Sequence, residues 1–370
     1  MSRPLRVDVN LTWLGAGRVG GSEEYLVRQL TGLPADGSLV VRLLCQRSFP
    51  GAYPELAERF ACIPTVMRRD RRPVRILAEH TWLAARTRTA DVVHHGGGTA
   101  PLVGRRPLVL TVHDLQYRRF PGYFSAGRRR YLEFMMPRSV ERAAVIAVPT
   151  GYVRGTVVDA FGVAPERVVV VPHGVPQPPV PPPALVDATL ERYGLTGRPF
   201  VIYPAITHPH KGHRLLVEML DGLDPEIALV LIGGEGDGER DLAALIGGGP
   251  HGSRVIRPGR VPTAERDALI AAAAAMAFPS EYEGFGAPCV EAMALGTPVV
   301  CSAAPALVEV VGEAGIVVAE PSGEAWSDAV RAAIGDADRL VAAGAVRRRD
   351  FTPDIAGRAL AAAYRQAVDS

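Results

Sequence analysis

Lysine and long apolar runs are what this 370-residue sequence lacks most clearly. Of its 41 basic residues only Lys211 is a lysine. The longest apolar run, Ala268–Phe278, has 11 residues, whereas a membrane-spanning helix needs about 20. The N-terminal segment also lacks the uninterrupted apolar core of a signal peptide. These absences argue against a membrane-spanning or exported protein, and we expect a cytoplasmic one.

Cysteine is scarce as well. The four cysteines are scattered and form no Cys-x-x-Cys pair: Cys45, Cys62, Cys289 and Cys301. This spacing predicts neither a zinc site nor a disulfide framework. We expect reduced thiols, as is usual in the cytoplasm.

Charge is nearly balanced overall but unevenly distributed along the chain. The formal net charge is +2, yet residues 1–180 hold 25 basic and 14 acidic residues, and residues 181–370 hold 16 and 25. A basic half favours an anionic partner such as a lipid surface or a phosphate, although a general arginine bias explains the excess equally well. No recognition-helix or aromatic-ladder motif accompanies the arginines, so we expect no nucleic-acid partner.

Two arginine runs stand out in the basic half, Arg68–Arg72 and Arg128–Arg130. Solvated surface is the ordinary explanation for such runs. The alternative is contact with an anionic or lipid-linked acceptor, with the protein bound peripherally to the inner face of a membrane. Four aromatic residues near the second run would add apolar anchoring: Tyr123, Phe124, Tyr131 and Phe134.

Strand-like and helical patterns alternate along the whole chain. This alternation predicts an α/β protein with two Rossmann-like domains, each a parallel sheet covered by helices on both faces. The expected strands are Arg6–Leu14, Leu39–Cys45, Asp91–His94, Leu108–Val112, Val145–Val148, Val168–Val171, Phe200–Tyr203, Ala228–Ile232, Arg254–Ile256, Met276–Phe278, Val299–Cys301 and Ile316–Val318.

A proline-dense segment over residues 175–184 marks the domain boundary, because it cannot continue a helix or a central strand. We predict a first domain over residues 1–178, a proline-rich linker over 179–197 and a second domain over 198–352. A final helix, residues 353–370, is expected to pack back toward the first domain. Ligands of such sheets bind beyond the carboxyl ends of the strands, so we expect the active site in a cleft between the domains.

The strongest group of functional candidates lies in Pro279–Val300. Glu283 and Glu291 are eight positions apart, and Pro288 between them suits the first turn of a helix. A carboxylate on that turn can bind a vicinal diol. A capped helix with a surface glutamate is the alternative. Three backbone amides before the helix would bind an anion or sugar hydroxyls, those of Gly284, Phe285 and Gly286.

This stretch resembles the E-x7-E signature of the family 4 glycosyltransferases, which have the GT-B fold, with two Rossmann-like domains facing each other across a cleft. Other segments agree: residues 203–213 resemble the family's phosphate-binding Lys-Gly segment, and residues 20–23 its first glycine-rich loop. Residues 111–115 and 171–175 resemble the segments that close the N-terminal side of the cleft.

The resemblance implies a retaining hexosyltransferase. The nucleotide-sugar donor would bind mainly to the C-terminal domain, and a hydroxyl acceptor, a sugar or a lipid-linked one, to the N-terminal domain. The form of residues 203–211 resembles a mannosyltransferase subgroup, which favours a GDP-sugar over a UDP-sugar. No cofactor is implied, because the nucleotide-sugar is a substrate.

On the donor side, the resemblance assigns Glu291 to the ribose and Glu283, with the loop amides, to the sugar. Lys211, together with Gly20 and Gly21, would hold the diphosphate. An ammonium beside a helix start can stabilise the charge of a leaving diphosphate without a metal. Base choice would depend on the backbone at Gly259–Val261, which includes the donor-binding candidate Val261, and on the loop Gly233–Gly238.

One departure from the family concerns a second cation. The family often carries an arginine five residues before the lysine, where this chain has Ile206. Arg214 or a histidine near Lys211 would have to compensate: His208, His210 or His213.

Histidines are the main candidates on the acceptor side. His113 follows a predicted strand, and the resemblance places it beside the transferred sugar, where it would act with Glu283 and Lys211 in catalysis by orienting the acceptor. A buried histidine with satisfied nitrogens is the alternative. The remaining acceptor-side candidates are His94, His95, Asp114 and His173.

Two other motifs have competing interpretations. Residues 15–20 match G-x-G-x-x-G, but the second strand ends without the acid that dinucleotide binding needs, so an NADP oxidoreductase is a weaker alternative. Asp336-Ala-Asp338 matches the D-x-D of metal-dependent transferases but lies between helical segments, so we expect a turn and no catalytic metal. A nucleotide-sugar hydrolase or epimerase, and a non-catalytic nucleotide-sugar-binding protein, remain as alternative functions.

Overall fold

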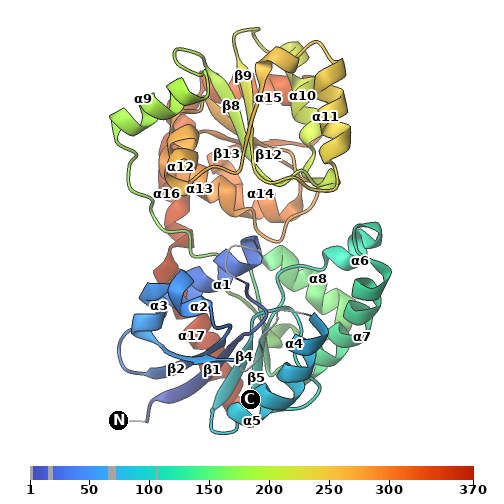
Figure 1. Cartoon of the computed structure of the whole chain (residues 1–370), viewed down its shortest axis with the longest axis vertical. Helices are drawn as coiled ribbons and strands as arrows, with labels where there is room; N and C mark the ends of the chain where they lie inside the picture. Colours follow the sequence, from blue (N-terminus) through green and yellow to red (C-terminus); the bar gives the residue numbers. More distant parts are fainter. Residues whose placement is uncertain (1–2, 16–19, 66–71, 106) are drawn as a thin grey trace. The chain divides into compact units, whose positions relative to one another are not determined.

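The computed structural model describes residues 3–15, 20–65, 72–105 and 107–370, which form two compact α/β units (Figure 1). The first unit contains the chain up to Gly174 and the returning segment Phe351–Ser370. The second unit is Val175–Asp350. The expected boundary at residue 178 thus lies four residues beyond the observed one.

The first unit is built on a seven-stranded sheet in the order β3-β2-β1-β4-β5-β6-β7. All neighbouring strands pair in parallel. The strands are β1 (Leu5–Leu11), β2 (Leu39–Cys45), β3 (Ala61–Pro64), β4 (Val92–His95), β5 (Leu108–Thr111), β6 (Val145–Val148) and β7 (Val168–Val170).

Helices cover both faces of this sheet (Figure 1). They and the shorter turns, labelled η, are α1 (Gly21–Thr31), α2 (Phe49–Ala52), α3 (Pro54–Arg59), α4 (Arg72–Ala78), η1 (Glu79–Leu83), α5 (Ala84–Arg86), α6 (Gln116–Arg119), η2 (Pro121–Tyr123), α7 (Ala126–Arg142), α8 (Gly151–Phe161), η3 (Pro165–Arg167) and α17 (Pro353–Asp369).

The two faces of the sheet have separate apolar cores. Val109 and Val145 point toward α1 and α17, whereas their neighbours Leu110 and Ile146 point toward α7 and α8. This is the two-residue alternation of a strand that is buried on both sides.

Helix α17 is part of the first unit although it ends the chain. Thr352 caps it, and its small residues lie directly on the end of α1. A Cβ added at Gly357 would lie 1.8 Å from the carbonyl oxygen of Gly32, so glycine is needed where the two helices meet.

The second unit has a six-stranded parallel sheet in the order β10-β9-β8-β11-β12-β13. The strands are β8 (Phe200–Pro204), β9 (Ala228–Ile232), β10 (Val255–Gly259), β11 (Ala275–Phe278), β12 (Val299–Ser302) and β13 (Gly315–Val318). The order reverses between β8 and β11, which is where ligands of doubly wound sheets bind.

Helices again flank the sheet on both faces (Figure 1). They and the short turns are α9 (Pro183–Arg192), η4 (Pro209–Lys211), α10 (His213–Glu218), η5 (Met219–Gly222), α11 (Glu239–Gly248), η6 (Gly252–Arg254), α12 (Thr263–Ala272), α13 (Ala287–Leu295), α14 (Pro305–Val311), η7 (Gly312–Ala314), α15 (Gly323–Gly335), α16 (Ala337–Arg347) and, leading out of the unit, η8 (Arg348–Phe351).

Two sequence expectations are corrected by these elements. The linker expected over residues 179–197 is irregular only up to Pro182, because Pro183 begins helix α9, where a proline at the first helical position costs no hydrogen bond. Strand β3 was not expected at all. Within the described ranges, no helix is both long and apolar enough to cross a membrane.

Candidate active site

Two loops of the second unit are hydrogen-bonded to each other beyond the carboxyl ends of β8 and β11. The backbone N–H of Glu281 donates to the carbonyl oxygen of His210 over 2.8 Å. Gly212 has a φ of 69°, and a Cβ there would lie 2.5 Å from the carbonyl oxygen of Pro279. The close backbone contact explains why glycine follows the lysine of this turn.

This contact brings together two of the residues singled out from sequence. Lys211 ends turn η4, and its Nζ lies 2.6 Å from Oε1 of Glu283. The two side chains are 20% and 15% exposed. The ammonium is also 5.9 Å from the centre of the Phe278 ring. A cation and a carboxylate, both mostly shielded from water, therefore share one corner of the site.

Glu291 lies just past the first turn of its helix, the turn on which the sequence placed it. Helix α13 begins at Ala287, so Glu291 is its fifth residue and stands in the second turn. The helix is capped by Gly286, with a φ of 97°, where a Cβ would lie 2.3 Å from Leu307 Cδ2. The buried Glu291 carboxylate lies 3.8 Å from the Arg266 guanidinium, which offsets part of its charge.

The other donor-side candidates present no charged or polar side chain to the site. Phe285 buries its ring, and Val261 packs against the core of the second unit. Gly284 stands between Glu283 and Phe285 in the loop before α13. Their proposed contacts with a donor remain predictions.

Three of the residues expected to supply a second cation near Lys211 do not fit that role: Arg214, His210 and His213. Arg214 is highly exposed and pairs with Glu218 one turn along its own helix, at 2.7 Å. Burial lowers the pKa of His210 and of His213 to about 4 each, so both are neutral at pH 7.

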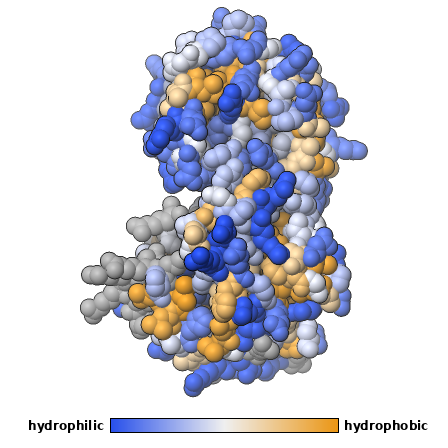
Figure 2. All heavy atoms as spheres, turned by 90° about the vertical axis from the view of Figure 1, so that its right-hand side faces the viewer, coloured by the Kyte–Doolittle hydropathy of each residue, from blue (hydrophilic) through white to orange (hydrophobic). Residues whose placement is uncertain are grey.

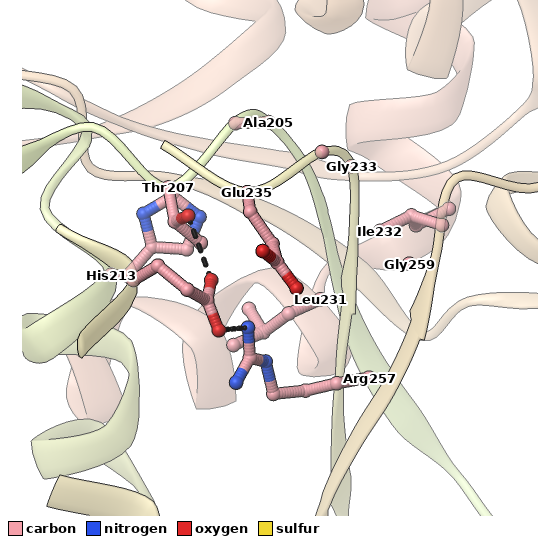
Figure 3. A pocket seen from close by; sticks show the side chains of 11 residues that line it. Ala205, Thr207, His213, Leu231, Ile232, Gly233, Glu235, Arg257 and Gly259 are labelled. Atoms are coloured by element: carbon pink, nitrogen blue, oxygen red, sulfur yellow. Dashed lines mark hydrogen bonds and ion pairs between the residues drawn. The ribbon is translucent and has the colours of Figure 1, made fainter. Parts of the chain in front are cut away.

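A cavity of about 230 Å³ lies at the carboxyl ends of β8, β9 and β10 (Figure 3). Inside it Thr207 donates to Glu239 over 2.9 Å, and Arg257 donates to the same carboxylate over 2.5 Å. The sequence indicated two of the loops around this cavity, Gly233–Gly238 and Gly259–Val261, but it identified none of the side chains as lining a cavity. The lining residues are Ala205, Thr207, His213, Leu231, Ile232, Gly233, Gly234, Glu235, Glu239, Arg257 and Gly259.

On the first unit, His113 lies at the carboxyl end of β5 beside aromatic rings. Its Nε2 lies 2.9 Å from the carbonyl oxygen of Gly96, to which it donates in the neutral form. The Tyr25 and Trp13 rings lie 5.2 and 6.2 Å from it, centre to centre. Burial lowers the pKa of His113 to about 4. This histidine can orient a hydroxyl group but is a weak base at pH 7.

The assignment of His94 to the acceptor side is wrong. Its side chain is completely buried, with Nδ1 2.8 Å from Tyr364 Oη and Nε2 2.8 Å from Thr111 Oγ1. Both ring nitrogens are therefore occupied inside the protein, and the residue joins helix α17 to the sheet.

His95 belongs to a buried polar network that the sequence did not reveal. Its Nδ1 lies 3.3 Å from the Asn10 amide, and the Glu79 carboxylate accepts from Thr12 over 2.9 Å. Burial raises the pKa of Glu79, although Arg75 at 3.8 Å opposes this. Polar residues at the end of a buried strand, Asn10 within β1 and Thr12 directly after it, were the available sequence signal.

The remaining first-unit candidates are near strand ends or helix starts. Asp114 accepts over 2.8 Å from the backbone N–H of Gln116, the first residue of α6. The buried His173 ring lies 4.5 Å from that of Tyr25. Gly20, with a φ of 74°, caps α1, and Gly21 is its first residue. Most of the G-x-G-x-x-G match and of the Arg68–Arg72 run lies outside the described residues.

The D-x-D match lies where α15 meets α16, and Asp336 pairs with Arg339 at 2.5 Å. In the part of the chain that the structure describes, no group of three or more His, Cys, Asp or Glu side chains is placed to hold a metal ion.

Family models match both halves of the chain. The model described as Glycosyltransferase Family 4 matches residues 19–177, and that described as Glycosyl transferases group 1 matches residues 189–347. The chain belongs to glycosyltransferase family 4.

Curated relatives with similar sequences include two named as mannosyltransferases. The chain is 31% identical to O-antigen chain mannosyltransferase B of Escherichia coli, over 63% of this chain and 62% of that protein. It is 32% identical to the MMP alpha-(1->4)-mannosyltransferase of Mycolicibacterium hassiacum, over 63% of this chain and 58% of that one. The matched region thus spans about three fifths of each relative.

The fold resembles that of Anabaena HepE in complex with UDP and glucose, with a TM-score of 0.76 and 19% identity over 97% of this chain and 98% of that one. It also resembles WaaG, a glycosyltransferase involved in lipopolysaccharide biosynthesis, with a TM-score of 0.69 and 18% identity over 97% and 98%. The two parallel sheets are those of the GT-B fold.

Proposed function

We propose that this protein transfers a hexose, mannose in the first instance, from a GDP-sugar to a hydroxyl acceptor with retention of configuration. The observation that carries the proposal is the Lys211–Glu283 pair, at 2.6 Å, beside the switch point of the second sheet. The relatives named as mannosyltransferases support the choice of sugar.

The chemistry follows from where charge develops. As the bond from C1 of the sugar to the diphosphate breaks, negative charge accumulates on the departing phosphate oxygen. The Lys211 ammonium stabilises that charge in a shielded site, so the reaction needs no metal ion. Glu283 holds sugar hydroxyls and Glu291 the ribose diol.

Retention follows from front-face displacement. The acceptor oxygen forms its bond to C1 on the face that the diphosphate leaves, and the acceptor proton passes to the departing phosphate oxygen. No covalent enzyme intermediate is required. His113, neutral because burial lowers its pKa to about 4, orients the acceptor and does not remove its proton.

Peripheral contact of this cytoplasmic enzyme with an anionic membrane is part of the proposal, since a lipid-linked acceptor is held there. Helix α7 supports it. Arg128, Arg130 and Arg138 are exposed on this helix, Phe134 is 51% exposed, and the Arg138 guanidinium lies 3.7 Å over its ring. Figure 2 views this side and shows hydrophilic and hydrophobic surface side by side. Arginine with exposed aromatic rings suits a charged lipid headgroup layer.

A binding and turnover panel tests the proposal. Thermal shifts are measured with GDP-mannose, UDP-, ADP- and dTDP-glucose, because a ligand at 100 times its dissociation constant adds about 2.7 kcal/mol of stability. We expect a shift with GDP-mannose, turnover that survives EDTA, and loss of turnover in Glu283→Ala with nucleotide binding retained.

Other outcomes would point to the alternatives. Free sugar as the main product under a broad acceptor screen indicates a hydrolase. Binding without turnover under every acceptor indicates a sensor. Sedimentation with vesicles containing phosphatidylglycerol, but not with phosphatidylcholine vesicles, tests the membrane contact; equal sedimentation with both would contradict it.

A further inference from the structure

Helices α12 and α13 pack against each other in the second unit (Figure 1), and one arginine reaches from the first to the second. Arg266 is the fourth residue of α12, and its Nη2 lies 3.8 Å from Oε2 of Glu291 on α13. The Glu291 side chain is only 10% exposed. Water therefore screens little of the attraction between the two charges. Arg266 is thus a charged partner of the carboxylate that the family resemblance assigns to the ribose.

This contact is an ion pair and not a hydrogen bond. A distance of 3.8 Å exceeds the range of about 2.7–3.2 Å for an N–H···O hydrogen bond. The guanidinium donates to the neighbouring Asp267, from Nε over 3.1 Å and from Nη2 over 2.9 Å to the same oxygen, Oδ1. Asp267 thereby holds the cation at a distance from which it attracts Oε2 of Glu291 without using a lone pair of that oxygen in this contact.

Other contacts fix helix α12 in place. Thr297, directly after the cap of α13, is buried and donates to the carbonyl oxygen of Ile270 on α12 over 2.5 Å. On its other side, Glu265 of α12 accepts from Arg192 over 2.7 Å and from Tyr193 over 2.6 Å at the end of α9. A charge carried on an element held in this way keeps the group that it attracts in one orientation.

The chemistry of a vicinal diol explains why orientation matters. Its two hydroxyl groups lie on adjacent carbons, and a carboxylate accepts from both only when its oxygens face them. Attraction to Arg266 draws Oε2 toward α12 and so limits the rotation of the Glu291 side chain. It also offsets a charge that is costly to bury alone. The arginine therefore orders the carboxylate before a ligand arrives, which reduces the entropy lost on binding.

We propose that Arg266 is a positioning residue, which acts through Glu291 to make the site select a ribose over a 2′-deoxyribose. The inference rests on the proposed function, because that function gives the ribose diol to Glu291. It does not depend on which base the donor carries.

Calorimetric titration of GDP and UDP, each beside its 2′-deoxy counterpart, measures this selectivity. In the wild type we expect the ribonucleotide to bind about tenfold to a hundredfold more tightly than its deoxy form, the range for a hydrogen bond to a charged group. In Arg266→Gln this ratio should fall to about threefold or less. Arg192→Gln is the matched control, since it removes an arginine that pairs with Glu265 of the same helix at 2.7 Å, and it should leave the ratio unchanged.

A double-mutant cycle shows whether the arginine acts through the carboxylate. Glu291→Gln alone should lower the ratio at least as far as Arg266→Gln does. Adding Arg266→Gln to that variant should lower the ratio no further. A further fall in the double variant would mean that Arg266 recognises the ribose on its own, which overturns the positioning role.

Failure of this inference is separable from failure of the proposed function. An unchanged ratio in Arg266→Gln, or an equal loss of affinity for the ribonucleotide and its deoxy form, overturns the inference while a nucleotide-sugar enzyme remains. Equal affinity for the two forms in the wild type refutes the assignment of the ribose to Glu291, and the inference with it. If none of the four nucleotides binds, the proposed function itself fails.

Discussion

Replacing Glu283 with glutamine should make the protein bind a nucleoside diphosphate more tightly, although it should abolish transfer. In the structure the carboxylate holds the Lys211 ammonium at 2.6 Å. A diphosphate that binds this ammonium therefore approaches a negative charge. Glutamine keeps the shape of the side chain and removes that repulsion, but it loses the charged acceptor for sugar hydroxyls.

The size of the effect follows from the geometry. A phosphate oxygen on the far side of Nζ would lie about 5 Å from the carboxylate, where two unit charges interact by about 3 kcal/mol at an effective dielectric constant of about 20 and by about 1 kcal/mol in water. The side chains are 20% and 15% exposed, which places the pair between these limits. We expect about tenfold tighter GDP binding, measured by isothermal titration calorimetry.

Two other variants complete the experiment. Lys211→Ala should lose most GDP affinity, because it removes the ammonium that pairs with Glu283. Glu281→Gln is the matched control, since this neighbouring residue has an exposed side chain and donates to the lysine turn through its backbone N–H. If GDP affinity falls in Glu283→Gln as it does in Lys211→Ala, the carboxylate supports the phosphate site rather than opposing it, and the assigned roles are refuted.

Three further predictions concern the first unit. Tyr364→Phe leaves Nδ1 of the buried His94 without a partner, so urea denaturation should show an unfolding free energy lower by about 1–3 kcal/mol, and unchanged stability would contradict the buried contact. Gly357→Ala places a Cβ 1.8 Å from the Gly32 carbonyl oxygen and should lower the melting temperature strongly, whereas Gly335→Ala, with open space around its Cβ, should not. Acid should also destabilise the protein: burial lowers the pKa of His94 to about 3, so the unfolded chain binds a proton there from about pH 6.5 downward while the folded one does not. The loss approaches about 1.4 kcal/mol per pH unit for this residue, and urea unfolding at pH 7 and pH 5 should show a smaller difference in His94→Gln.

Most of the sheet architecture could be predicted because parallel strands are buried on both faces. Such strands appear as short apolar runs, as in β6 or β9, and twelve of the expected runs coincide with observed strands. Strand β3 (Ala61–Pro64) could not be recognised in this way. It lies at the edge of the sheet, and none of its residues is fully buried. It therefore does not appear as an apolar run, and it ends in proline, which is unusual in a strand.

The site was predictable as a set of residue types but not as contacts. The spacing of Glu283 and Glu291 and the single lysine identified chemical groups, and the glycines around them indicated close backbone approach. The 2.6 Å contact between Lys211 and Glu283 depends on two loops that follow different strands, 72 positions apart in the chain. The start of the helix was predicted less well than the residue types. Because the helix begins at Ala287, Glu291 stands in its second turn.

His94 and His113 show why two similar candidates lie in different surroundings. Both are histidines at strand ends in the first unit, and the sequence around them treats them alike. On a strand, however, a side chain points to one face or the other, and His94 points to the face that α17 covers. The residue that His94 contacts on that face, Tyr364, lies 270 positions away in the chain. The position of its helix follows from packing and not from any local sequence pattern. His113 comes after the end of β5, where no strand neighbour fixes its direction, and it meets Tyr25 and Trp13 instead. The direction of a side chain that follows a strand is therefore not set by the alternation of the sheet, whereas that of a side chain within the strand is, and the sequence alone could not separate these two histidines.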